Sequence, residues 1–263
     1  MTALLRAENV CKAFGGVQAL NDCCVEVEQG SIAGLIGPNG SGKTTLFNVI
    51  TGYEAVDSGE VYLNDDRITD NPPDKVFGLG IGRTFQLTRV FSRLTVMENM
   101  IVAAQHQERA GAVGWGRIRN PLARAGGPAT RHRAMELLEF TGIASHAGAL
   151  AETLSYGQRK LLELSYVLMA NPSIVLLDEP AGGVNPTLMA TITDRIRELN
   201  RQGTTFLIVE HNMDFVMGLC DRVTVLDYGN AVVTGPPNVI RSDRRVLDAY
   251  LGTAEDDDDI SAA

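Results

Sequence analysis

The segment Gly37-Pro-Asn-Gly-Ser-Gly-Lys-Thr44 constrains this chain more than any other part of its sequence. It fits the pattern G-x-x-x-x-G-K-[ST] without a mismatch, and it stands between an apolar run, residues 31–36, and a helical run that begins at Thr44. Glycines in such a turn let backbone N–H groups point inward at a helix N-terminus, where they bind phosphate. At ordinary residue frequencies, a chain of this length contains the pattern by chance on the order of one time in a hundred. The segment therefore predicts a nucleotide-binding loop between a strand and a helix.

The side chains of this loop differ in their expected roles. Lys43 would place a positive charge on the β- and γ-phosphates, and the hydroxyl of Thr44 would ligate Mg²⁺. The predicted nucleotide-binding residues of the loop are Gly37, Pro38, Asn39, Gly40, Ser41, Gly42, Lys43, Thr44 and Thr45.

Two carboxylates, Asp178 and Glu179, directly follow the apolar run of residues 173–177. A parallel strand would deliver them to the carboxyl edge of its sheet, which is where nucleotides bind in such folds. We expect Asp178 to hold Mg²⁺ and Glu179 to orient or deprotonate the attacking water. A solvated turn after a strand is the alternative for such a pair alone, and the phosphate loop makes it the weaker interpretation.

The apolar runs at residues 173–177 and 204–209 are typical of strands that are buried on both faces of a parallel sheet. Four aliphatic residues between them recur at helical spacing, and a glycine ends the pattern: Leu188, Ile192, Ile196, Leu199 and Gly203. This strand–helix–strand order predicts an α/β fold with a covered sheet. The other predicted strands are residues 25–28, 31–36, 60–64, 222–226 and 231–234, and a mostly helical part at about 93–169 is broken at 107–133.

The net charge of −9 argues against a basic surface for nucleic acid, so no nucleic-acid partner is expected. No apolar stretch approaches the roughly 20 residues that a membrane-spanning helix needs, and no secretion signal is expected at the N-terminus. The cysteines, Cys11, Cys23, Cys24 and Cys220, show no C-x-x-C spacing, which favours reduced thiols in a cytosolic protein. The acidic tail, residues 253–263, is predicted to be disordered.

Further motifs point to one family. Leu154-Ser-Tyr-Gly-Gln158 resembles the signature motif of ABC-type ATPases, with Tyr in place of the first Gly, and it precedes Asp178 at the typical spacing. Gln86, in Arg83-Thr-Phe-Gln86, resembles the Q-loop glutamine of this family, and His211 resembles its switch histidine. Phe14 stands where the family keeps an aromatic residue that stacks on adenine. The resemblance covers residues 4–252.

This resemblance implies a P-loop (RecA-like) α/β fold, with a mostly parallel sheet core, an antiparallel β subdomain and a helical subdomain that carries the signature. The helical subdomain would span about residues 87–160 and contain the Arg- and Gly-rich insertion at about 107–133. Two such domains would sandwich two ATP molecules in composite sites. The implied catalytic residues are Glu179, His211 and Gln86, the implied Mg²⁺ ligands are Thr44, Gln86 and Asp178, and the second chain would contribute Ser155 and Gly157.

Finer details are similar to the ATPase subunit of branched-chain amino-acid importers. They are Phe14-Gly-Gly, Arg83-Thr-Phe-Gln, Leu94-Thr-Val-Met-Glu-Asn, the Tyr variant of the signature, Gly183-Val-Asn-Pro, Val209-Glu-His-Asn-Met and Ala249-Tyr-Leu-Gly. The implied partners are integral-membrane permeases, a second ABC ATPase chain that is identical or related, and, indirectly, an extracytoplasmic substrate-binding protein. The implied location is the cytoplasmic face of the cell membrane, and the helical segment after Gln86 is the expected docking surface.

Several motifs also have a purely structural interpretation. Ser155-x-x-Gln158 is a capping box that would open a helix at residues 158–169, and Phe14 could belong to the core. The segment after Glu179 departs from the family pattern Ser-Ala-Leu-Asp, because Asn185 stands in place of the Asp. Asn185 before Pro186 reads as a helix N-cap, so a role for it between subunits is in doubt.

Other functions remain as alternatives to the branched-chain amino-acid importer. Urea and short-chain amide importers have closely similar ATPases, and lipid or polysaccharide exporters share the architecture. A non-transport ABC ATPase in translation would carry two cassettes, and one in DNA repair would insert a long coiled coil. A regulatory module that does not hydrolyse ATP is disfavoured by the joint presence of Glu179, Gln86 and His211.

Overall fold

The computed structural model describes residues 2–85, 90–111 and 126–256. Its centre is a six-stranded sheet with the strand order β10-β9-β3-β8-β7-β6, in which every neighbouring pair is parallel except β9 and β10. The strands are β3 (Ile32–Ile36), β6 (Ile81–Arg83), β7 (Ile174–Asp178), β8 (Thr205–Val209), β9 (Arg222–Asp227) and β10 (Asn230–Gly235). β3, β7 and β8 are buried at every position, as their continuous apolar sequences predict.

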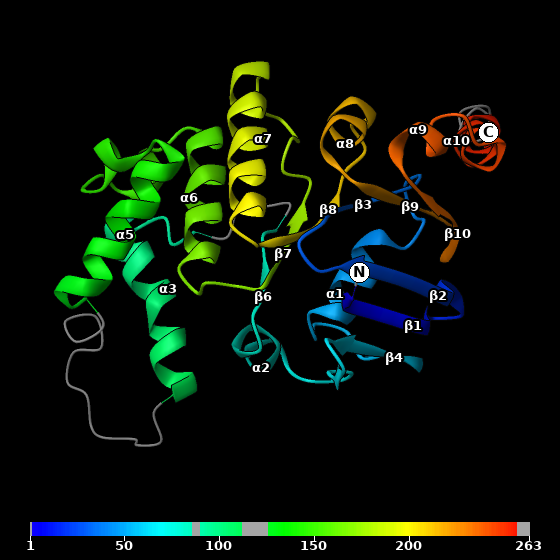
Figure 1. The fold of residues 1–263 in the computed structure, drawn as a ribbon, viewed down its shortest axis with the longest axis horizontal. Coiled ribbons are helices and arrows are strands. Elements are labelled where there is room, and N and C mark those ends of the chain that lie inside the picture. Colours follow the sequence, from blue (N-terminus) through cyan, green and yellow to red (C-terminus); the bar gives the residue numbers. More distant parts are fainter. Residues whose placement is uncertain (1, 86–89, 112–125, 257–263) are drawn as a thin grey trace.

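A second, antiparallel sheet has the order β2-β1-β4-β5. Its strands are β1 (Ala3–Phe14), β2 (Val17–Glu28), β4 (Ser58–Leu63) and β5 (Asp66–Arg67). This sheet lies at one end of the molecule in Figure 1, and α1 (Lys43–Ile50) lies between it and the central strands. The predicted α/β class, with a mostly parallel core and an antiparallel sheet, is confirmed.

Three long helices gather at the opposite end of the molecule (Figure 1): α3 (Val96–Gly111), α5 (Pro128–Thr141) and α6 (Tyr156–Leu168). Two short 3₁₀ turns, η1 (Ala144–His146) and η2 (Ala151–Thr153), connect α5 to α6. The remaining helices are α2 (Pro73–Gly78), α7 (Pro186–Arg201), α8 (Met213–Leu219), α9 (Pro237–Ile240) and α10 (Arg244–Asp256).

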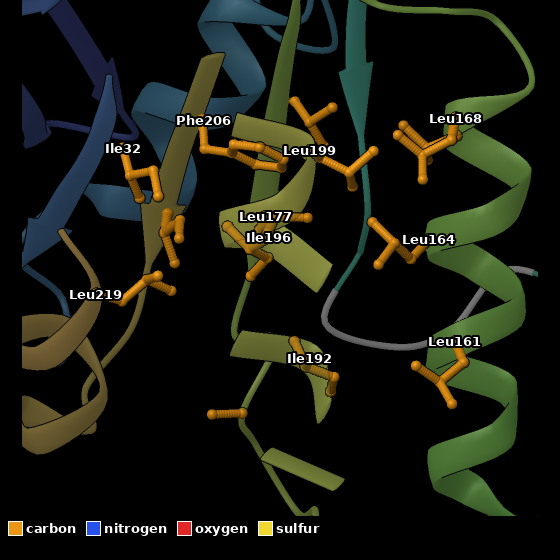
Figure 2. Close-up of a cluster of buried hydrophobic side chains, with 14 of the residues drawn as sticks. Ile32, Leu161, Leu164, Leu168, Leu177, Ile192, Ile196, Leu199, Phe206 and Leu219 are labelled. Carbon is orange, nitrogen blue, oxygen red and sulfur yellow. The ribbon is translucent and has the colours of Figure 1, made fainter. Parts of the chain in front are cut away.

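The core between α6, α7 and the central sheet follows directly from helical periodicity. Ile192, Ile196 and Leu199 of α7 are buried as predicted. Figure 2 shows Leu199 near Phe206 of β8, with Ile196 and Ile192 successively farther along α7, while Leu161, Leu164 and Leu168 of α6 point toward the same region from the other side. Burying each such side chain contributes about 1.5–3 kcal/mol. α6 and α7 are therefore held in a fixed relation to the carboxyl edge of the sheet.

The structure contains several strands that the sequence did not predict. The sequence predicted neither β1 nor the two short strands β5 and β6, and it gave only the last residues of β2. α10 continues through Asp256, into the first residues of the tail that was predicted to be disordered; residues 257–263 lie outside the described part, and the prediction for the tail stays a prediction. α3 and α5 enter the predicted insertion from both sides, and residues 112–125 also lie outside it. The domain limits 4–252 and 87–160 stay predictions.

The four cysteines are free thiols in the structure. Burial raises the pKa of Cys23 and of Cys220 to about 12, so both are inert packing residues at neutral pH. Among the described residues, none of the helices combines the length and the apolar character that crossing a membrane requires.

Candidate functional site

The phosphate loop connects the end of β3 to the first turn of α1. Gly37 (φ 151°) and Gly42 (φ 102°) have backbone angles that favour glycine. A Cβ atom would lie 2.1 Å from the carbonyl oxygen of Leu226 at position 37, and 2.4 Å from that of Ala19 at position 42. These two positions therefore require glycine for space as well as for conformation, and α1 begins directly after Gly42.

The ammonium of Lys43 is bound inside this loop. Its Nζ donates to the carbonyl oxygens of Gly37 (2.8 Å) and Pro38 (2.7 Å) and to Ser41 Oγ (3.3 Å). Burial lowers the pKa of Lys43, and the charges of Glu179 and Asp178 oppose that shift. The ammonium therefore lies across the loop, held by its carbonyl oxygens and by Ser41.

Asp178 is the last residue of β7, and its side chain is almost fully buried. Arg83, from the end of β6, donates through Nη2 to Asp178 Oδ2 at 3.2 Å. Burial raises the pKa of Asp178, and the guanidinium of Arg83 acts against that rise. The sequence placed Asp178 at this edge of the sheet but did not identify Arg83 as its partner.

Arg83 also fastens the helix of the phosphate loop. Its Nη1 donates to Asn48 Oδ1 (2.8 Å) and to Thr51 Oγ1 (2.9 Å), at the end of α1. The guanidinium lies 4.9 Å from the centre of the Phe85 ring, within range of a cation–π contact. One buried arginine thus joins β6, α1 and the aspartate at the end of β7.

Glu179 and His211 meet at the same edge, although they are far apart in sequence. His211 Nδ1 lies 3.4 Å from Glu179 Oε1, and the N–H of Glu179 donates to the carbonyl of Val209 at 2.9 Å. Glu179 has φ 49°, in the left-handed region that residues other than glycine rarely occupy. Because β3, β8 and β7 are neighbours in the sheet, their ends bring together the phosphate loop, His211 and the two carboxylates.

A buried carboxylate that was not predicted from the sequence holds the backbone of this cluster through hydrogen bonds. Glu210 is 1% exposed, and it accepts hydrogen bonds from the N–H groups of Ala181 (2.7 Å), His211 (3.1 Å) and Asn212 (3.3 Å). It therefore ties the turn after Glu179 to the turn that carries His211. An acidic residue at the end of an apolar strand was the available signal in the sequence.

The signature residues occupy a different position. Ser155 caps α6: its Oγ accepts from the N–H of Gln158 (3.2 Å), and the Gln158 side chain accepts from the N–H of Ser155 (2.9 Å). The predicted capping box is therefore confirmed. Ser155 is exposed, and among the described residues neither Ser155 nor Gly157 hydrogen-bonds to the phosphate loop.

The remaining predicted residues are placed as follows. Phe14 ends β1 and is 45% exposed as a residue, and the ammonium of Lys12 lies 5.2 Å from the centre of its ring. Asn185 caps α7 through a bond from the N–H of Leu188 (2.8 Å), as predicted. Thr44 is exposed in the first turn of α1. Gln86 lies outside the described residues.

Comparison with known proteins gives one consistent result. The profile of the ABC transporter family matches residues 20–182. The chain is 38% identical over 252 residues to the high-affinity branched-chain amino acid transport ATP-binding protein LivG of Escherichia coli (strain K12), an alignment that covers 95% of this chain and 98% of LivG. It is 35% identical over 252 residues to the BraF protein of Pseudomonas aeruginosa, which has the same description, with coverage of 95% and 98%.

Solved structures agree with the sequence relatives. The ADP conformation of MJ1267, an ATP-binding cassette of an ABC transporter, superposes with a TM-score of 0.83 at 34% identity and covers 96% of this chain and 100% of that chain. The dimeric structure of MJ0796, a bacterial ABC transporter cassette, gives a TM-score of 0.76 at 25% identity, with coverage of 89% and 98%. The similarity therefore extends over nearly the whole of this chain.

Proposed function

The chain belongs to the ABC transporter family, and we propose that it is the ATPase subunit of an importer for branched-chain or related amino acids. It is an ATP-binding, ATP-hydrolysing cassette. The observation that carries the proposal is the cluster at the carboxyl edge of the sheet, where the phosphate loop, Asp178, Glu179 and His211 converge. The branched-chain substrate rests on the descriptions of LivG and BraF.

In the proposed mechanism, the phosphate loop binds the β- and γ-phosphates through backbone N–H groups and Lys43. The Lys43 ammonium exchanges its bonds to Gly37 and Pro38 for bonds to phosphate oxygens. The residues of the loop that we assign to nucleotide binding are those from Gly37 through Thr45. Phe14, whose exposed ring is available to a planar ligand, is assigned to stacking on adenine.

Glu179 is assigned as the group that orients or deprotonates the attacking water. His211, 3.4 Å from the Glu179 carboxylate, would hold that carboxylate in place and contact the γ-phosphate. Glu210 fixes the backbone of both turns, so the pair meets without a large rearrangement. Gln86 is assigned to the same site from the family resemblance.

The oxygen groups at this edge fit a magnesium ion. Thr44 presents a hydroxyl at the first turn of α1, and Asp178 has one carboxylate oxygen on Arg83, which leaves the other for a cation. Thr44, Asp178 and Gln86 would hold the ion, which when bound would neutralise charge on the β- and γ-phosphates. A site of this kind needs only one carboxylate, because the phosphates supply further oxygen ligands.

Ser155 and Gly157 are proposed to act on the nucleotide of a second ABC ATPase chain. The capped N-terminus of α6 is exposed and carries the positive end of the helix dipole, which favours an anion such as a γ-phosphate. The MJ0796 cassette forms a dimer, which is the arrangement proposed here. A dimer would complete two composite sites, whether the second chain is identical or related.

The permease subunits are proposed to dock near the segment that follows Gln86. A cavity of about 320 Å³ lies there, and aromatic side chains form much of its lining: Tyr53, Phe77, Phe85, Phe91 and Tyr166. Tyr53 and Phe91 are exposed, and aromatic residues are enriched in protein–protein interfaces. The chain would then lie on the cytoplasmic face of the membrane, bound through permeases that receive substrate from an extracytoplasmic binding protein.

The experiment that tests the transport function is a mild-detergent pull-down of the tagged chain from its native membranes, followed by mass spectrometry. We expect two polytopic permeases, a second ATPase and an amino-acid-binding protein. Recovery of a urea- or amide-binding protein would change the substrate, and permeases without any binding protein would favour an exporter. Recovery of soluble partners only would leave the ATPase activity intact and refute the transport function.

A further inference from the structure

The backbone at Glu179 is held from several directions. Its φ of 49° is a conformation that persists in a non-glycine residue only where the surroundings enforce it. The N–H of Glu179 is bonded to Val209 in β8, and its carbonyl accepts from the N–H of Gly182 at 3.1 Å. The same carbonyl accepts a second hydrogen bond, from Lys160 Nζ. The side chain that we assign to catalysis thus begins at a strained and fully hydrogen-bonded peptide unit.

Lys160 is an unusual residue for such a contact. It lies in α6, is 9% exposed, and has its ammonium 5.4 Å from the centre of the Tyr156 ring. Within the part of the chain that the structure describes, no carboxylate lies within 4.0 Å of this ammonium. Burying a charge is costly, and two interactions offset the cost here: the hydrogen bond to the Glu179 carbonyl and the charge of Asp178, whose pKa Lys160 lowers.

The same face of α6 holds a second segment of the site. Glu163, one turn after Lys160, is 6% exposed and accepts a hydrogen bond from the N–H of Phe85 at 2.9 Å. Phe85 immediately precedes Gln86. The cavity between these residues and Asp178 has a volume of only about 30 Å³, roughly the space of one water molecule. α6 is therefore packed closely against both the Glu179 turn and the strand end that leads to Gln86.

The start of α6 contacts that turn as well. A Cβ atom at Gly157 would lie 2.1 Å from the Leu188 side chain of α7, and one at Gly183 would lie 3.2 Å from the Tyr156 ring. Ser155 and Gly157, at this N-terminus, are the residues assigned to the second chain's nucleotide. One rigid helix thus carries a proposed phosphate contact at its start and a bond to Glu179 within the next turn and a half.

We propose that Lys160 is a positioning residue that fixes the backbone of Glu179 relative to the N-terminus of α6. This inference rests on the proposed roles of Glu179 and of the α6 N-terminus. As a consequence, a displacement of the signature segment would change the position of Glu179 in the same chain. Contact between the signature segment and a second chain's nucleotide is then transmitted through Lys160 to Glu179.

The test compares the full-length chain carrying Lys160→Met, Lys160→Arg or the control Lys75→Met, which makes the same change at an exposed position of α2. Steady-state ATPase assays give kcat and KM, and fluorescent-nucleotide titration gives the affinity for ADP. A displaced reacting group costs on the order of tenfold to a hundredfold in rate. We expect Lys160→Met to lower kcat by at least about tenfold, KM and ADP affinity to stay within about twofold of wild type, and Lys160→Arg to recover part of kcat.

The same substitution in a Glu179→Gln background provides a second readout. Substitutions at residues that act through the same group have non-additive effects. Lys160→Met should therefore lower the residual ATPase rate of Glu179→Gln little further. Three results would each overturn the inference. They are a wild-type kcat in Lys160→Met, a loss of ADP affinity in Lys160→Met as large as its loss of kcat, and a rate of the double variant that is lowered by the product of the two single effects. If Lys160→Met does not fold, as judged by circular dichroism, Lys160→Gln takes its place under the same criteria. Wild-type turnover of Glu179→Gln itself would overturn the assignment of Glu179 and, with it, this inference.

Discussion

Replacing Arg83 by Met would leave the Asp178 carboxylate buried without the guanidinium that now opposes its desolvation. Both side chains are 6% exposed, so the pair is a buried one. Removing one partner of a buried ion pair typically costs about 3–5 kcal/mol, because the remaining charge is uncompensated. Arg83→Met also removes the bonds to Asn48 and Thr51, so we expect the upper part of that range. For a chain of this size, the melting temperature should fall by about 2 °C per kcal/mol, hence by about 8–10 °C.

The sign of the pH dependence follows from the raised pKa of Asp178. A carboxyl group whose pKa is higher in the folded state than in the unfolded state destabilises the fold once it is ionised. The penalty is absent below the unfolded pKa and complete above the folded one. Arg83 lowers the folded pKa, so its removal raises that pKa further. The destabilisation by Arg83→Met should therefore grow as the pH rises from acid toward neutrality.

The assay is urea denaturation of wild type, Arg83→Met, Asp178→Asn and the double variant at pH 5 and pH 7.5. Asn keeps the shape of Asp but carries no charge, so the ion-pair part of the Arg83→Met cost should vanish in the Asp178→Asn background. A coupling energy of about 1–3 kcal/mol at pH 7.5, smaller at pH 5, is expected for groups in direct contact. Equal costs of Arg83→Met in both backgrounds, or a cost that grows toward acid pH, would refute this reasoning.

Three further substitutions test the site. Lys43→Ala removes a charged donor to phosphate and should weaken ATP binding by about 10- to 100-fold, as measured by calorimetric titration. Glu179→Gln should bind ATP with unchanged affinity, lose turnover and accumulate an ATP-dependent dimer in size-exclusion chromatography; a wild-type rate would disprove its role as the base. Ser155→Ala removes the cap of α6 and should cost about 1 kcal/mol of stability. It should also lower turnover with no change in ATP affinity of the monomer, whereas a weakened monomer affinity would place Ser155 in its own chain's site.

The parts of the fold that the sequence predicted are those in which local pattern and tertiary role agree. β3, β7 and β8 are buried on both faces, so their sequences are continuous apolar runs. The phosphate loop requires glycine at positions 37 and 42 because a side chain would not fit there, and both positions belong to one short sequence motif. The caps Ser155 and Asn185 are local interactions, and both are present as predicted.

The elements that were missed depend on partners distant in the chain. β1 mixes buried and exposed residues irregularly, because register shifts interrupt its pairing with both β2 and β4, and no strict alternation results. β6 has three residues and exists because it pairs with β7. β1 lacks a regular alternation and β6 is too short to show one, so neither strand gives a periodic signal in the sequence.

The unpredicted site residues share a physical reason as well. Arg83, Glu210, Lys160 and Glu163 are charged side chains that are buried, a state that sequence statistics assign to almost no charged residue. Each is stabilised by hydrogen bonds to backbone or to side chains from another strand or helix, so its burial becomes visible only when those elements are placed together. The loop residues from Gly37 to Thr44, by contrast, form one contiguous motif, so the role that we propose for them can be predicted from the sequence alone. The chemistry of the site is therefore encoded in local motifs, while the groups that hold its parts in register are encoded in the fold.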